Sequence, residues 1–186
     1  MIILASKSPR RKEIVSNLFG DINIQTYNVE ETYKSIRPSS IVMELSKKKI
    51  KPIIANDDDI VISADTIVYY KGEILGKPKD EKDAYRMLSM LSNKTHSVYT
   101  GVTIKKGNKT DTFYDKSEVK FKELTKQEIL DYINTGSPKD KAGSYGIQDK
   151  WLIDHYIGSY TNILGLPVEK LIDELKKFNV EVKWQN

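Results

Sequence analysis

The chain has 186 residues, a net charge of +4 and no cysteine. This length allows one large domain, or one compact two-lobed unit, to bury a core without covalent staples. The absence of cysteine excludes disulfides, thiolate metal sites and a cysteine nucleophile. The small cationic excess suits an anionic small ligand but falls short of a nucleic-acid-binding surface. With no signal-peptide pattern and no apolar run of about 18 residues, we expect a soluble, cytoplasmic protein that does not bind membranes.

Strand and helix signals alternate along the chain, which predicts an α/β fold. The elements expected in the first half are a buried strand over Ile2–Ala5, a helix from Pro9 capped by Ser8 and stopped by Gly20, a helix from Pro38, and a central strand over Ile60–Tyr70. Those expected in the second half are a helix over Asp80–Leu91, a hairpin of Ser97–Lys105 with Thr110–Lys122, a helix from the capping box at Thr125 to Gly136, a loop with short strands over Asp140–Leu166, a helix from Pro167 and a closing strand over Val180–Trp184.

Two hydroxyls and two arginines surround the start of the first predicted helix: Ser6, Ser8, Arg10 and Arg11. Cations in a first turn oppose the helix dipole. Backbone N–H groups at a helix N-terminus attract anions, and serine hydroxyls and arginine forks add donors. A bound phosphate would therefore resolve the charge conflict. The alternative is an ordinary serine cap followed by two surface arginines.

Asp65 interrupts the apolar run of the predicted central strand. An aspartate there is costly to bury unless it is paired or binds a metal, which favours a functional role over a strand-end cap or a simple lysine pair. Lys49 shares a predicted helix face with Val42 and Leu45. It either snorkels to solvent or reaches into a cleft.

Two later segments carry weaker signals. Lys77 lies in the turn Leu75–Pro78, and Gln148 follows Gly143 and Gly146 in a loop where backbone can approach a ligand closely. His96 and His155 have no ligand spacing, so neither is expected to bind a metal. The chain has no Walker loop, no GxSxG and no HExxH motif.

Taken together, these stretches resemble the Maf family, and the resemblance spans nearly the whole chain. The matching motifs, in order, are Ser6-x-Ser8-Pro9-Arg10-Arg11, Val29-Glu30-Glu31, Leu45-Ser46-Lys47-Lys48-Lys49, Ala64-Asp65-Thr66, Leu75-Gly76-Lys77-Pro78, His96-x-Val98-x-Thr100-Gly101-Val102, Asp140-Lys141-Ala142-Gly143-x-Tyr145-Gly146-Ile147-Gln148 and Gly158-Ser159-Tyr160-x-Asn162-x-x-Gly165-Leu166-Pro167.

The resemblance implies one Maf-like domain over residues 1–186, an elongated mixed sheet flanked by helices, with two lobes around a cleft, similar to the inosine-triphosphate pyrophosphatases. It implies hydrolysis of a nucleoside triphosphate between the α- and β-phosphorus with a divalent metal, Mg²⁺ or Mn²⁺. Asp65 matches the family's proton acceptor, and Arg10, Thr66 and Gln148 match its specificity positions for dTTP and UTP. A house-cleaning role or cell-division arrest is expected, and a homodimer is left open.

The chemistry of the remaining residues fits this reaction. A triphosphate needs donors and countercharges, for which Ser6, Ser8, Arg10, Arg11, Lys49 and Lys77 are the candidates. Glu31 and Asp65 offer the oxygen ligands that Mg²⁺ and Mn²⁺ prefer. We assign proton abstraction from water to Asp65 and metal binding to Glu31 with Asp65. The reverse assignment of the two carboxylates remains open.

Alternatives remain. A sister branch of the family acts on 7-methyl-GTP but typically has Ser-Asp-Gln in place of Ala64-Asp65-Thr66. A regulator that binds a nucleotide or nucleic acid without turnover, acting on cell division, is the rival from another class. The chain departs from the family pattern at Asn93 and at Asp149, where glycine is usual. Asp149 places a carboxylate beside Gln148, a specificity position.

Overall fold

The structure is a computed structural model that describes residues 1–182. The chain divides into two compact units. The first contains Met1–Asp65, Thr100–Asp115 and the residues from Gly165 onward, and the second contains Thr66–Tyr99 and Lys116–Leu164. The prediction of a single domain with a cleft between two lobes stays a prediction.

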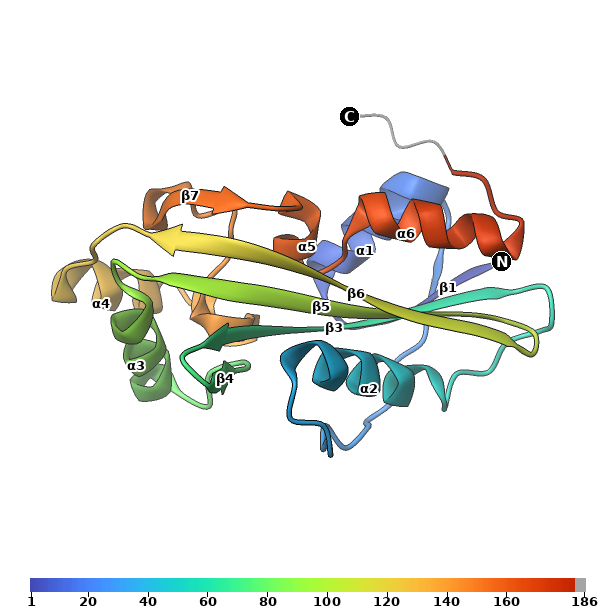
Figure 1. Ribbon diagram of the computed structural model, residues 1–186, viewed down its shortest axis with the longest axis horizontal. Coiled ribbons are helices and arrows are strands. Elements are labelled where there is room, and N and C mark those ends of the chain that lie inside the picture. The colour runs from blue at the N-terminus through green and yellow to red at the C-terminus, as the bar shows by residue number, and fades with distance from the viewer. Residues whose placement is uncertain (183–186) are drawn as a thin grey trace. The chain divides into compact units, whose positions relative to one another are not determined.

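The described strands form a seven-stranded mixed sheet in the order β2-β1-β3-β5-β6-β7, with β4 paired to β3 (Figure 1). The strands are β1 (Ile2–Ala5), β2 (Asn23–Ile24), β3 (Ile60–Tyr70), β4 (Glu73–Leu75), β5 (Thr95–Lys106), β6 (Lys109–Phe121) and β7 (Ile153–Ile157). Strand β1 runs parallel to β2 and β3, whereas the β3–β4 and β6–β7 pairs are antiparallel. The α/β prediction and the central strand are therefore confirmed.

In the described part of the first unit, the α-helices are α1 (Pro9–Phe19), α2 (Pro38–Ile50) and α6 (Val168–Leu175). Helices α1 and α6 cover one side of its strands and α2 covers the other (Figure 1). The Ser8 hydroxyl accepts from the Arg11 amide at 3.4 Å, and Gly20, with φ +78°, ends α1. The predicted starts at Pro9 and Pro38 and the stop at Gly20 are confirmed, and α6 begins one residue after the predicted Pro167.

Helix α2 packs against strand β5 without space for a side chain at Gly101. A Cβ atom there would lie 2.3 Å from the carbonyl carbon and oxygen of Val42. Nearby, the buried hydroxyls of Ser46 and Thr103 share a hydrogen bond of 2.8 Å between the same two elements. These contacts fix where the last turn of α2 lies, and Lys49 belongs to that turn.

The second unit contains α3 (Glu81–Leu91), α4 (Lys126–Asn134) and α5 (Tyr160–Leu164). The Asp80 side chain caps α3, and Thr125 with Glu128 forms the predicted capping box of α4. The large side chains at the centre of this unit include Leu75, Leu88, Leu91, Phe121 and Leu152, all with a relative exposure of 0%.

Some predicted elements differ from the structure. The segment Asp140–Leu166 contains an expected short strand, β7, but also short 3-10 helices at Ala142–Ser144 and Lys150–Leu152 and helix α5. A further 3-10 helix, Ser137–Asp140, leads into it. Helix α5 was missed because its five residues carry no apolar repeat. Strands β2 and β4, of two and three residues, are too short to show a pattern.

The predicted closing strand is wrong for Val180–Val182, which form no strand, and residues 183 and 184 lie outside the described part of the chain. Asn179 turns the chain with a left-handed φ of +58° after the last 3-10 helix, and no described strand pairs with Val180–Val182. Within residues 1–182, no helix is both long enough and apolar enough to cross a membrane.

Candidate active site

Lys49, Asp65 and Glu31 form a charged cluster in the first unit. The Lys49 ammonium forms ion pairs with Asp65 Oδ1 and, at 3.1 Å, with Glu31 Oε1. The side chains of Lys49 and Asp65 are 21% and 10% exposed, whereas that of Glu31 is 63% exposed. Lys49 therefore does not snorkel outward but joins two carboxylates from different segments. Asp65 does have a lysine partner, and that partner is itself a candidate site residue.

Glu31 lies in the irregular segment between β2 and α2, and α2 holds this segment in place. The Glu44 carboxylate accepts from the Lys34 amide at 3.0 Å and from the Ser35 hydroxyl at 2.8 Å. Lys48 donates to the Thr32 hydroxyl at 3.1 Å. The Ser35 hydroxyl bond, followed by the backbone bond from Lys34, lowers the pKa of Glu44. Glu44 is not among the predicted site residues, because its partners lie in a loop that has no repeating pattern.

Arg11 is directed at acceptors within the protein. Its Nε donates to the carbonyl of Gly165 at 2.8 Å, and its Nη1 donates to the carbonyl of Ala64 at 2.9 Å and to the Ser6 hydroxyl at 3.3 Å. Burial lowers the pKa of Arg11 and the neighbouring Asp65 carboxylate raises it, but an arginine keeps its charge throughout. Arg11 thus binds the residue directly before Asp65. Its predicted contact with substrate stays a prediction.

Ser6, Ser8 and Arg10 surround the start of α1 as predicted. Ser6 is 8% exposed, and its hydroxyl accepts from the Ser8 amide at 3.2 Å. Ser8 and Arg10 are half-buried. The serines therefore shape the turn between β1 and α1, where the Ser8 and Arg11 amides donate to serine hydroxyls.

Thr66, Lys77 and Gln148 belong to the second unit. Thr66 follows Asp65 along β3, so the two side chains point to opposite faces of the sheet. Lys77 and Gln148 are exposed. The Gly143 amide donates to the carbonyl of Gly76 at 3.1 Å, so the turn that carries Lys77 is joined directly to the loop that carries Gln148.

The loop that carries Gln148 needs glycine at position 143. Its φ is +69°, and a Cβ atom would lie 2.7 Å from Cγ2 of Val68 on β3. Asp149, which departs from the family pattern, accepts at Oδ2 from the Tyr132 hydroxyl at 2.5 Å. Its carboxylate is therefore bound to helix α4. Tyr132 is not among the predicted site residues, because only the fold brings it to this loop.

His96 is a core residue of the second unit. Its side chain is buried, its Nε2 shares a hydrogen bond of 2.7 Å with the Tyr145 hydroxyl, and burial lowers its pKa to about 3. The described residues contain no group of three or more histidine, aspartate or glutamate side chains placed to hold a metal by themselves.

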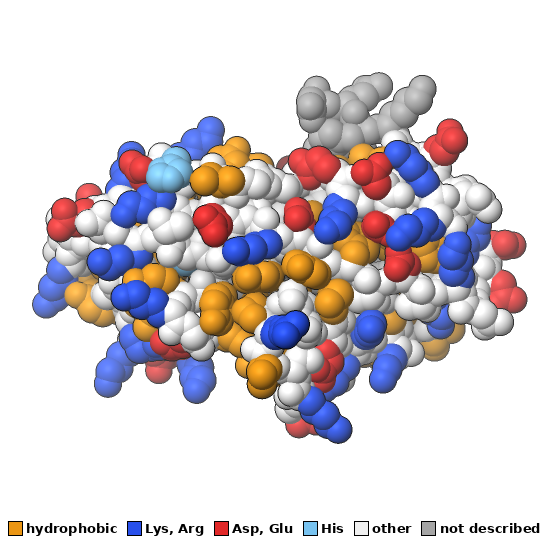
Figure 2. Space-filling view, viewed as in Figure 1, with side chains coloured by type: hydrophobic (Ala, Val, Ile, Leu, Met, Phe, Trp, Pro, Cys, Tyr) orange, Lys and Arg blue, Asp and Glu red, His pale blue; other side chains and the backbone are white. Residues whose placement is uncertain are grey.

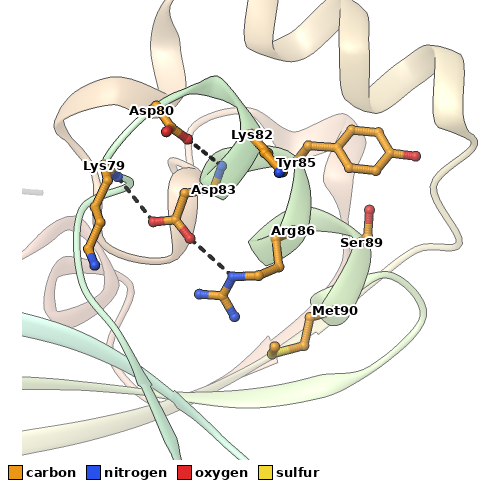
Figure 3. A pocket seen from close by; sticks show the side chains of 8 residues that line it. All are labelled: Lys79, Asp80, Lys82, Asp83, Tyr85, Arg86, Ser89 and Met90. Carbon is orange, nitrogen blue, oxygen red and sulfur yellow. Dashed lines mark hydrogen bonds and ion pairs between the residues drawn. The ribbon is translucent and has the colours of Figure 1, made fainter.

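A pocket of about 750 Å³ lies along helix α3 (Figure 3). Its lining residues are Lys79, Asp80, Lys82, Asp83, Tyr85, Arg86, Ser89 and Met90. None of the predicted site residues is among them, and Arg86 is already paired with Asp83 at 3.0 Å and Glu73 at 2.6 Å.

Figure 2 shows cationic and anionic side chains interspersed on the visible face rather than gathered by sign. We therefore place the candidate active site at the Lys49 cluster.

Known proteins resemble this chain over nearly its whole length. The family described as Maf-like protein matches residues 1–178. The chain belongs to the Maf family. This Maf protein is 50% identical to the dTTP/UTP pyrophosphatase of Bacillus cereus (strain ATCC 10987 / NRS 248), over 97% of the chain and 91% of the relative. It is 46% identical to the dTTP/UTP pyrophosphatase of Agathobacter rectalis, over 97% of the chain and 98% of the relative.

Solved structures with a similar fold are more distant in sequence. The Ham1 protein of Staphylococcus aureus aligns with a TM-score of 0.53 at 14% identity, covering 95% of the Maf chain and 98% of its own. A HAM1 protein from Coxiella burnetii aligns with a TM-score of 0.51 over the same shares of the two chains. At this identity the likeness concerns the fold alone, and it confirms the predicted mixed sheet flanked by helices.

Proposed function

We propose that this Maf protein hydrolyses dTTP and UTP to the nucleoside monophosphate and pyrophosphate. The observation that carries the proposal is the 50% identity, over nearly the whole chain, to a relative named dTTP/UTP pyrophosphatase. The cluster of Lys49, Asp65 and Glu31 supports it, because hydrolysis of a phosphoanhydride requires both countercharge and a proton acceptor.

Each part of the cluster has a task in this reaction. Asp65, held on the central strand, accepts the proton of the attacking water. Lys49 supplies a positive charge for the phosphates and orients the Asp65 carboxylate. The Ser8 hydroxyl and the Arg10 guanidinium, at the start of α1, offer further donors for phosphate oxygens.

We also propose that Asp65 and Glu31 hold a divalent metal, Mg²⁺ or Mn²⁺. Their carboxylates come from separate segments and both contact the Lys49 ammonium, so the two sets of oxygen donors lie close to each other. Two carboxylates completed by substrate phosphates are a usual donor set for Mg²⁺. When bound, the metal neutralises phosphate charge and polarises a phosphoryl oxygen.

Pyrophosphate release from a nucleotide panel, with Mg²⁺ or Mn²⁺ and with EDTA, tests the proposal. We expect kcat/KM for dTTP and UTP to exceed those for CTP, ATP, GTP and 7-methyl-GTP by at least about 10-fold, because a site built for one base edge leaves polar groups unpaired with others. EDTA should abolish release. A preference for 7-methyl-GTP would place the protein in the sister branch. Binding without release from any nucleotide would favour the regulator.

A further inference from the structure

The segment Gly146–Asp149 forms a turn that presents Gln148. The Asp149 amide donates to the Gly146 carbonyl at 3.0 Å, which closes the turn through the backbone. Ile147 is 3% exposed and packs in the core of the second unit, whereas Gln148 is exposed. Consecutive residues of the turn thus point in opposite directions, one into the core and one into solvent.

Tyr132 of helix α4 bridges the two ends of this turn. Its hydroxyl accepts from the Gly146 amide at 3.2 Å and donates to Asp149 Oδ2 at 2.5 Å. The Ser137 hydroxyl donates to the same carboxylate oxygen at 3.3 Å. One phenol oxygen therefore holds the residues on both sides of the pair Ile147–Gln148.

The bridge is largely shielded from solvent. Tyr132 is 4% exposed, and its ring meets that of Trp151 edge-on with 5.5 Å between centroids. Burial, and then the hydrogen bond to the Asp149 carboxylate, raises the pKa of Tyr132. The hydroxyl consequently remains a donor to Asp149 at every pH at which the protein would work.

We propose that Tyr132 and Asp149 are positioning residues that fix the Gln148 amide for recognition of the nucleotide base. The inference rests on the proposed function. An amide can pair with the imide edge of thymine or uracil only if its donor and acceptor are held at a set orientation. The Asp149 carboxylate acts from behind the turn, on Tyr132, rather than on the base.

Steady-state kinetics of Tyr132→Phe and Asp149→Ala test the proposal. We expect KM for dTTP to rise about 10-fold and kcat to stay within about 3-fold, because a misplaced base contact weakens substrate and transition state alike. The preference for dTTP over CTP should shrink by a similar factor. Asp149→Asn, which keeps an acceptor for the hydroxyl, should have a KM close to that of the parent protein.

Two matched variants serve as controls. Tyr156→Phe removes the hydroxyl of an exposed tyrosine on β7, and Asp154→Asn neutralises an exposed carboxylate on the same strand. Both should retain the parent KM. In the double variant Tyr132→Phe/Asp149→Ala, KM should rise by less than the product of the two single-variant increases, because both changes break the same hydrogen bond.

A binding measurement separates this inference from the proposed function. In a Trp184→Phe background Trp151 is the single tryptophan, and its ring packs on Tyr132. We expect its fluorescence to report binding of a dTTP analogue with a methylene group between the α- and β-phosphorus. The dissociation constant should rise about 10-fold in Asp149→Ala.

The outcomes are distinct. If the parent protein releases no pyrophosphate from any nucleotide but binds the analogue, the proposed function fails and the fluorescence titration still decides the role of Tyr132 and Asp149. Folded variants that lose melting temperature while KM and the analogue's dissociation constant stay at the parent values would overturn the inference, because the bridge would then be structural only. If Tyr132→Phe does not fold, the role of the bridge is decided by comparing KM of Asp149→Ala with KM of Asp149→Asn.

Discussion

The ammonium group of Lys49 is ion-paired with the carboxylate of Asp65, so the last turn of helix α2 and the middle of strand β3 meet at a charged contact. Both groups are largely withdrawn from solvent, where an unpaired charge would be costly. Because the same ammonium also contacts Glu31, the contact extends to the segment before α2.

Asp65→Asn should lower kcat for dTTP at least about 100-fold while the protein remains folded. The substitution preserves the size of the side chain and an oxygen that faces Lys49, but it removes the basic carboxylate. Pyrophosphate release together with thermal melting measures both effects. Asp58→Asn, an exposed carboxylate of the same unit, is the matched control. Parent-like turnover in pure Asp65→Asn would refute the assignment of Asp65 as proton acceptor.

Arg11→Ala should lower the free energy of unfolding by about 2–4 kcal/mol, since the carbonyls of Ala64 and Gly165 would lose a charged donor. Arg11→Lys should recover only part of this, because an ammonium lacks the planar fork. Urea unfolding gives the values. If Arg11→Ala unfolds like the parent protein and only KM rises, Arg11 acts on the substrate instead.

Arg10→Ala, unlike Arg11→Ala, should change the kinetics and leave the stability almost unchanged. Arg10 is half-buried in the first turn of α1, where a cation opposes the helix dipole. We expect KM for dTTP to rise about 10-fold and the free energy of unfolding to change by less than about 0.5 kcal/mol. Kinetics and urea unfolding on the same preparation provide the test. A large loss of stability with unchanged kinetics would make Arg10 structural.

Gly101→Ala should destabilise the fold by about 3 kcal/mol, because the added Cβ would meet the Val42 backbone at 2.3 Å and backbone cannot give way cheaply. Since α2 would have to shift, the Lys49–Asp65 contact and turnover should suffer too. Gly76→Ala, whose added Cβ would meet no atom within 4 Å, is the control and should be nearly neutral. Equal stability of the two variants would contradict the close approach of α2 and β5.

Glu44→Gln should destabilise the protein at neutral pH and lose this effect in acid. The hydrogen bonds from Ser35 and Lys34 lower the pKa of Glu44 below its usual 4.5. The stabilisation is therefore present above that value and is lost as pH falls through the lower pKa of the folded state. Melting temperatures of parent and Glu44→Gln should converge in that acidic range. A constant difference at every pH would show that the carboxylate charge is not involved.

The sequence by itself determined the helices and the central strand, because their signals are local. Ser8, Asp80 and Thr125 each bind the backbone within three residues, and the strand Ile60–Tyr70 is marked by its own apolar run. The sequence also marked Lys49 and Asp65 as residues at odds with their surroundings, because a charge on an apolar face stands out without knowledge of its partner.

Only the tertiary structure decided which of these residues are partners. Lys49 reaches Asp65 because Gly101 lets α2 approach β5 closely. The contact of Arg11 with Gly165 joins positions 154 residues apart. Tyr132 meets Asp149 because α4 packs beside the turn that carries Gln148. Such contacts depend on how whole elements pack, and no local pattern of residues records that packing.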